Sequence, residues 1–172
     1  MNEIIPLPIN DFWSPVIDGE TFIEFQNYCK KEEKLSVGDI EIIKENAKMI
    51  IQRCIKPNSV NSLNRTNLHI GDVQSGKTLT MAAAIALAHD NNFLLTTLLT
   101  GTKTILKAQN ESRIEFILQW IDKDRDKFYF YKGDDSQLET QVKQLDRKLR
   151  SVPYKTMIVS IILKETKHIK DL

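Results

Sequence analysis

Residues 68–89 read LHIGDVQSGKTLTMAAAIALAH, and this stretch decides the fold. Its first residues, Leu68–Ile70, predict a short β-strand. Its last residues, Thr78–His89, are apolar almost all round and predict a buried helix. The turn between them fits the spacing GxxxxGK(S/T) without departure. It consists of Gly71, Asp72, Val73, Gln74, Ser75, Gly76, Lys77 and Thr78.

Each fixed position of this turn suits the binding of anionic phosphate. Glycines allow a positive φ and a close approach of backbone N–H groups, and the helix that follows adds about half a positive charge at its N-terminus. Lys77 is long enough to reach the β and γ phosphates of ATP, and the Thr78 hydroxyl can ligate Mg²⁺. We therefore predict an ATP site over residues 71–78. The alternative is a plain Gly-Lys-Thr turn with an exposed lysine.

Strands and helices alternate along the rest of the chain. Further strands are expected at Phe93–Leu99, Phe128–Tyr131 and Met157–Leu163. Helices are expected at Ile105–Ile121 and after a capping box at Ser136–Glu139. This alternation predicts an α/β fold with a doubly wound parallel sheet and helices on both faces. Because four strands are few for such a sheet, we expect it to be incomplete.

The N-terminal third has a different pattern, so we divide the chain into residues 1–66 and 67–172. Three prolines interrupt the first 20 residues, which predict an irregular arm. A helix is expected to open at Asp18 or Thr21. A second helix is expected from Ser36, where Asp39 completes a capping box. Residues 57–66 are rich in Asn and Ser and predict a loop.

Composition excludes several classes of protein. The 172 residues are 41% hydrophobic and 27% charged, which is ordinary for a globular chain. Cys29 and Cys54 make no disulfide framework, and a reducing cytoplasmic location fits them best. No apolar run is long enough to span a membrane. A net charge of +1 gives no strong global attraction to nucleic acid or lipid.

A second segment of interest runs from Leu99 to Gln109 and leaves the carboxyl end of a predicted strand. Its small, hydroxyl and basic residues can hold a phosphate oxygen. The candidates are Thr100, Gly101, Thr102 and Lys103. With Lys107 and Arg113, Lys103 forms at most a small basic patch. The alternative for this segment is an ordinary helix cap.

This segment resembles the Pro-Thr-Arg-x-Leu-x-x-Gln motif of superfamily-two DEAD/DEAH-type helicases, which grips nucleic acid. Here Gly101 replaces the proline, Lys103 replaces the arginine, and Gln109 comes one residue late. GDVQSGKT followed by LTGTKTILKAQNESRI is more similar still to helicase-like ATPases of bacterial restriction and phage-defence systems. The resemblance covers residues 67–118, and a weaker similarity extends over residues 157–172, MIVSIILKETKHIKDL.

The resemblance implies a RecA-like phosphate-loop lobe that uses ATP and Mg²⁺. It also implies that Thr100–Lys103 contact a nucleic-acid backbone, that DNA or RNA is a partner of the full-length parent protein, and that a nuclease partner or domain accompanies it. In DEAD-type helicases a glutamine upstream of the phosphate loop reads adenine, and Gln52 lies at a plausible spacing for that role. The alternative for Gln52 is a solvent-facing residue near a helix end. Phe12 and Trp13 could stack on the base, although packing in the core is commoner.

ATP hydrolysis needs further acidic groups, which hold the metal and orient water. No Asp-Glu-x-Asp or Asp-Glu-x-His run occurs in the sequence. Glu165 comes too late after its strand, and Asp134-Asp135 fits a helix cap. We therefore expect an N-terminal piece of a longer ATPase that binds nucleotide and hydrolyses it poorly or not at all. Alternatives are a small nucleotide or metabolite kinase and a binding module with a vestigial phosphate loop.

Overall fold

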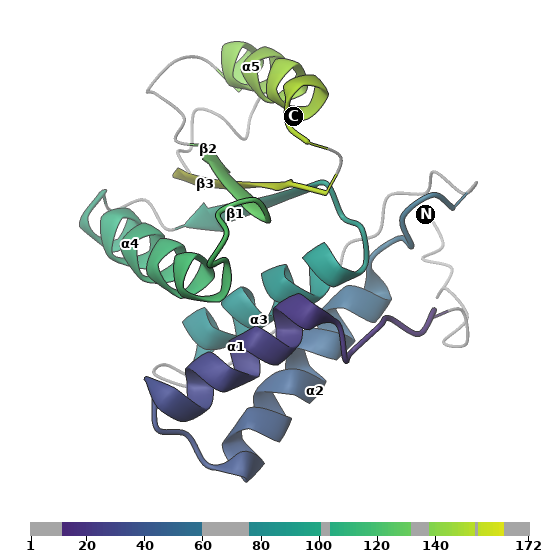
Figure 1. The fold of residues 1–172 in the computed structure, drawn as a ribbon. Coiled ribbons are helices and arrows are strands. Elements are labelled where there is room, and N and C mark those ends of the chain that lie inside the picture. The colour runs from purple at the N-terminus through teal and green to yellow at the C-terminus, as the bar shows by residue number, and fades with distance from the viewer. Residues whose placement is uncertain (1–11, 60–75, 101–103, 132–137, 154, 164–172) are drawn as a thin grey trace, which may run out of the picture.

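The computed structural model describes residues 12–59, 76–100, 104–131, 138–153 and 155–163 (Figure 1). This part of the chain forms five helices and three strands. The helices are α1 (Glu20–Lys31), α2 (Val37–Arg53), α3 (Lys77–Asp90), α4 (Thr104–Ile121) and α5 (Leu138–Ser151). The strands are β1 (Leu95–Thr100), β2 (Phe128–Tyr131) and β3 (Met157–Leu163).

The three strands form a parallel sheet in the order β1-β3-β2. Leu95 of β1 lies opposite Ile158 of β3, and Phe128 of β2 lies opposite Met157 of β3. β3 is central, as a continuous apolar strand should be. The α/β class and the parallel sheet are thereby confirmed. The strand expected at Leu68–Ile70 lies outside the described residues.

Helices cover both faces of the sheet, as the alternation predicted. The chain moves outward from β1 through α4 to β2, and returns through α5 to the central β3. Because crossover connections are right-handed, two crossovers in opposite directions place their helices on opposite faces. Figure 1 shows α4 on the same side as α1, α2 and α3, with α5 alone on the other.

Side chains alternate between these two faces along β2. Phe128 and Phe130 belong to the large core beneath α3 and α4. Tyr129 and Tyr131 belong to a smaller cluster, together with Ile158 of β3. The period of two that characterises a strand thus supplies both faces with apolar surface.

α3 is the buried centre of the large core, which confirms the prediction of a buried helix. Its alanines Ala82, Ala83 and Ala86 are fully buried. Alanine side chains are small enough to let neighbouring helices pack closely around them. Phe22 and Phe25 of α1 belong to the same core, and their rings stack 5.8 Å apart. The N-terminal helices therefore share one hydrophobic core with α3 and α4.

The two N-terminal helices are capped in different ways. α2 begins with the predicted capping box, in which Ser36 Oγ accepts from the Asp39 amide and Asp39 accepts from the Ser36 amide. α1 begins at neither of the residues expected. Its N-cap is Gly19, which has no side chain to cap the helix.

The cap of α1 comes from the far end of α3. The Asp90 carboxylate accepts hydrogen bonds from the backbone amides of Thr21 (3.1 Å) and Phe22 (2.9 Å). A carboxylate at a helix N-terminus is favoured by the helix dipole as well as by the hydrogen bonds. Because Asp90 is distant in sequence, reading α1 by itself could not identify this cap.

The neighbours of Asp90 extend the contact. The Asn91 side chain accepts from the Val16 amide (2.8 Å) and donates to the Val16 carbonyl (2.9 Å), so it holds the irregular arm. His89 Nε2 donates to the Lys155 carbonyl (2.9 Å), because a carbonyl can only accept. His89 Nδ1 then accepts from Thr21 Oγ1 (2.9 Å). We call His89, Asp90 and Asn91 the α3 clamp.

Gly19 is needed because the clamp leaves no space beside it. A Cβ atom at Gly19 would collide with the side chain of Asp90. We expect Gly19→Ala to lower the free energy of unfolding by about 1–3 kcal/mol, as overpacking does. Chemical denaturation measures this change. The matched control is Gly38→Ala in α2, where the new Cβ would lie 3.8 Å from Ser36 Oγ.

The control should be neutral or stabilising, because alanine favours a helix over glycine. The cost of Gly19→Ala should also shrink in an Asp90→Ala background, where the obstructing carboxylate is gone. Equal costs in the two backgrounds would show that Asp90 is not the obstacle.

The α3 clamp also predicts a pH dependence of stability. Burial opposes ionisation of Asp90, but the hydrogen bonds from the backbone amides of Phe22 and Thr21 favour the ionised carboxylate and help to hold its pKa below the usual 3.8. A lowered carboxyl pKa stabilises the fold above its ordinary value, and this contribution is lost as the pH falls through the folded pKa. We expect Asp90→Ala to cost about 1–2 kcal/mol at neutral pH.

The difference in unfolding free energy between the protein and Asp90→Ala should be constant above about pH 5 and should close below about pH 4. Urea titrations across this range measure it. Asp18→Ala, which removes an exposed carboxylate just before α1, is the control and should change stability by less than about 0.5 kcal/mol. A difference that persists unchanged at low pH would contradict the role given to the ionised carboxylate.

Candidate functional site

The described part of the GxxxxGK(S/T) turn is its last three residues, where α3 begins. Gly76 is the N-cap, with φ 74° and ψ 17°, in the left-handed region. A Cβ at this position would meet nothing within 4 Å, so the backbone conformation rather than crowding favours glycine. The helix starts at Lys77, one residue before the predicted start. Gly71, Asp72, Val73, Gln74 and Ser75 lie outside the described residues.

Contacts with α1 give the direction of α3 and α4. The start of α1 lies against the end of α3, where Asp90 caps it. Ion pairs join Glu20 to Lys127 (2.8 Å), just beyond the end of α4, and Glu33 to Arg113 (3.4 Å), nearer its start. α1 therefore runs antiparallel to both helices. It follows that α3 and α4 run in the same direction and begin on the same side of the molecule.

That side is the carboxyl edge of the sheet. β1 ends at Thr100 and α4 begins at Thr104, so the start of α4 adjoins the end of β1 (Figure 1). The N-termini of α3 and α4 are thus both directed to the edge where the parallel strands end. Helix N-termini carry partial positive charge, and ligands of parallel α/β sheets bind at this edge.

The residues at the start of α3 have the chemistry for an anion and a hard cation. Gly76 has no side chain to cap the helix, and its carbonyl accepts the first helical hydrogen bond, from Thr80 (3.0 Å). The first amides of a helix lack partners within the helix and can bind an anion. Lys77 and Thr78 are half-buried beside them. An ammonium suits phosphate, and a threonine hydroxyl is an oxygen ligand of the kind that Mg²⁺ prefers.

The structure does not bring Gln52 to this site. Gln52 is half-buried near the end of α2, next to Cys54, whose carbonyl accepts from Trp13 Nε1 (2.9 Å). The Trp13 ring lies 6.4 Å from that of Phe93, which follows α3. Gln52 therefore lies toward the C-terminal end of α3. The 14 residues of α3 span about 20 Å, and Lys77 lies at the opposite end. Trp13, which belongs to the arm, packs against the large core. The adenine contact of Gln52 stays a prediction.

The predicted nucleic-acid segment lies mostly outside the described residues. Thr100 is the last residue of β1 and pairs with Leu163 of β3, whereas Gly101, Thr102 and Lys103 are not described. Of the small basic patch expected there, Arg113 forms an ion pair with Glu33 (3.4 Å). At least one of its cations is therefore engaged within the fold.

The acidic candidates Asp134, Asp135 and Glu165 also lie outside the described residues. Within the described ranges, no group of three or more His, Cys, Asp or Glu side chains could hold a metal ion. Sequence reasoning missed the α3 clamp, which has a positioning role at the other end of α3. Its only sequence signal is a cluster of polar residues, His89–Asn92, after a long apolar run.

No protein-family model, curated protein or solved structure matches this chain. None of the helices among the described residues is both long and apolar enough to cross a membrane.

Proposed function

We propose that this chain is the ATP-binding segment of a helicase-like, nucleic-acid-dependent ATPase with a RecA-like lobe. The observation that carries the proposal is the end of the GxxxxGK(S/T) turn. There a left-handed glycine opens a helix whose N-terminus is directed to the carboxyl edge of a parallel sheet. This context supports a phosphate-binding turn over a chance match to the spacing.

The residues at the start of α3 would divide the work of holding Mg-ATP. The amides of the turn and of the first helical residues bind phosphate oxygens, and Lys77 neutralises charge on the β and γ phosphates. The Thr78 hydroxyl supplies one ligand to Mg²⁺. The body of α3 keeps these groups in place, because eight of its 14 residues are buried.

The nucleic-acid part of the proposal comes from the resemblance of residues 67–118 to helicase-like ATPases of restriction and phage-defence systems. In it, DNA or RNA is the partner of the parent protein, Thr100–Lys103 contribute backbone contacts, and a nuclease partner or domain acts alongside. A cytoplasmic location is part of the same proposal. Cys29 and Cys54 are free thiols, which fits a reducing compartment.

Removal of the Lys77 ammonium tests the nucleotide site. Mg-ATP at 100 times its Kd should stabilise the chain by about 2.7 kcal/mol, which thermal unfolding detects. We expect Lys77→Ala to abolish this stabilisation, because no other described side chain of the turn carries a positive charge. Lys30→Ala, at an exposed position in the last turn of α1, should retain it. An unchanged ATP-induced shift in Lys77→Ala would refute the site.

We further propose that the chain binds ATP but hydrolyses it poorly or not at all. A steady-state assay tests this. Without an Asp-Glu-x-Asp or Asp-Glu-x-His run to hold the metal and orient water, kcat should be far below about 1 per second. The assay measures phosphate release with and without single-stranded DNA or RNA. A kcat near 1 per second would reveal a catalytic acid at another position. Transfer of phosphate to a nucleoside or metabolite would favour a kinase instead.

A further inference from the structure

The described helices differ in net charge. Basic and acidic residues balance in each of α1, α2, α3 and α4, so each of these helices has a formal net charge of zero. α5 has the sequence LETQVKQLDRKLRS, in which four basic residues stand against two acidic ones, for a net charge of +2. The overall charge of +1 therefore conceals an uneven distribution.

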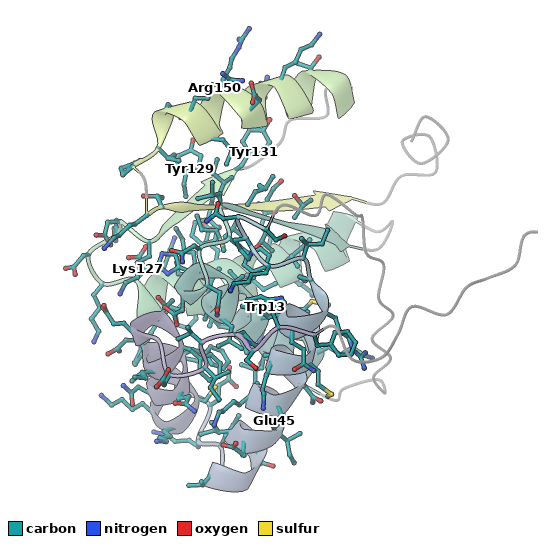
Figure 2. The ribbon with its side chains drawn as sticks, turned by 90° about the vertical axis from the view of Figure 1, so that its right-hand side faces the viewer. Trp13, Glu45, Lys127, Tyr129, Tyr131 and Arg150 are labelled. Carbon is teal, nitrogen blue, oxygen red and sulfur yellow. The ribbon has the colours of Figure 1, made fainter. Side chains whose placement is uncertain are left out.

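One side of α5 packs against the sheet. Leu149 belongs to the small apolar cluster around Tyr131 and Ile158. The Tyr131 hydroxyl donates to Gln144 Oε1, and the Lys148 ammonium lies 4.7 Å from the centre of the Tyr129 ring. Figure 2 shows both tyrosines between α5 and the sheet. One basic residue of α5 is thus used to hold the helix in place.

The other three basic residues of α5 are exposed. Lys143, Arg147 and Arg150 recur at helical spacing and cover about 10 Å of the helix. We call them the α5 basic face. Arg150 forms a surface ion pair with Asp146 (3.1 Å) and is 77% exposed. Because such a pair contributes little energy, Arg150 remains able to contact another anion. Figure 2 shows it on the side of α5 away from the sheet.

The exposed basic residues of this face favour a charged partner over an apolar one. Among the side chains that the structure describes, the large hydrophobic ones that are exposed all precede residue 117. A helix that binds a membrane surface buries its apolar side in lipid. Leu149 of α5 and Val152, which follows the helix, instead pack against the small apolar cluster of the sheet. The complementary partner is a hydrophilic polyanion.

We infer that the α5 basic face binds the phosphodiester backbone of a nucleic-acid strand. This inference deepens the proposed function, because it names a surface that meets the nucleic acid. Lysine and arginine spaced along a helix neutralise successive phosphates without reading sequence. The contact lies on the opposite face of the sheet from α1 and α4, and it is separate from the small patch in which Arg113 is ion-paired.

Fluorescence anisotropy with a labelled 20-nucleotide single-stranded DNA tests the inference. The binding constant of the 172-residue chain is measured against salt concentration, without nucleotide, and again with RNA of the same sequence. The test variant is Lys143→Gln/Arg147→Gln. The control is Lys30→Gln/Lys31→Gln, which makes the same change of charge at exposed positions of α1, across the sheet.

The slope of log K against log salt is negative, and each lost contact to a single strand reduces its magnitude by about 0.7. The test variant should therefore reduce that magnitude by about 1.4. Its affinity at low salt should fall roughly tenfold or more, and the control should bind as the unchanged chain does. Thermal unfolding verifies that each variant folds. Arg147→Gln alone, with a slope change of about 0.7, replaces the double variant if that variant does not fold.

Three results would overturn the inference: no binding by the unchanged chain, equal losses in the test and control variants, or equal binding to vesicles of anionic phospholipid. The Mg-ATP thermal shift, measured on the same samples, distinguishes failure of this inference from failure of the proposed nucleotide site. A shift without nucleic-acid binding refutes the α5 basic face and leaves the nucleotide site. Binding that depends on α5 without a shift supports the face and refutes the nucleotide site.

Discussion

The buried carboxylate of Asp90 is the contact on which the arrangement of the helices depends. It ends α3 and caps the first amides of α1, so one side chain fixes where one helix stops and the other starts. The negative charge of a carboxylate is matched by the partial positive charge of the α1 N-terminus. With α1 fixed in this way, it runs antiparallel to α3 and α4 and covers both. The directions of α3 and α4 relative to the sheet follow from the same packing.

The two ends of α3 have opposite properties. At the C-terminal end, His89, Asp90 and Asn91 bond to the arm, to α1 and to the segment before β3. At the N-terminal end, Gly76 contributes only backbone, and its left-handed conformation directs the chain into the helix. A helix held firmly at one end, with its first amides at the carboxyl edge of the sheet, suits a site for an anionic ligand. The nucleotide that we propose requires such an arrangement.

The charges are divided between the two faces of the sheet. On the side of α1 and α4, three ion pairs join acidic residues in or just after α1 to basic residues in or just after α4. They are Glu20–Lys127, Glu24–Lys123 and Glu33–Arg113. Each of these basic residues lies within ion-pair distance of an acidic residue. On the other side, Leu149 of α5 packs against the sheet, and the helix has a formal net charge of +2. A chain of nearly zero net charge can therefore have a basic surface, because its charges are divided unevenly among the helices.

The sequence by itself determined the α/β class, three strands to within two residues, the buried character of α3 and the capping box of α2. These features depend on local periodicity and on hydrogen bonds between near neighbours, which a single stretch of chain contains. The spacing from Gly71 to Thr78 likewise identified the candidate phosphate site. Only the tertiary structure decided that Asp90 caps α1, that Gln52 lies toward the C-terminal end of α3, and that Arg113 pairs with Glu33. Each of these depends on which distant segments meet, and burial of apolar surface between helices, rather than local preference, sets those meetings.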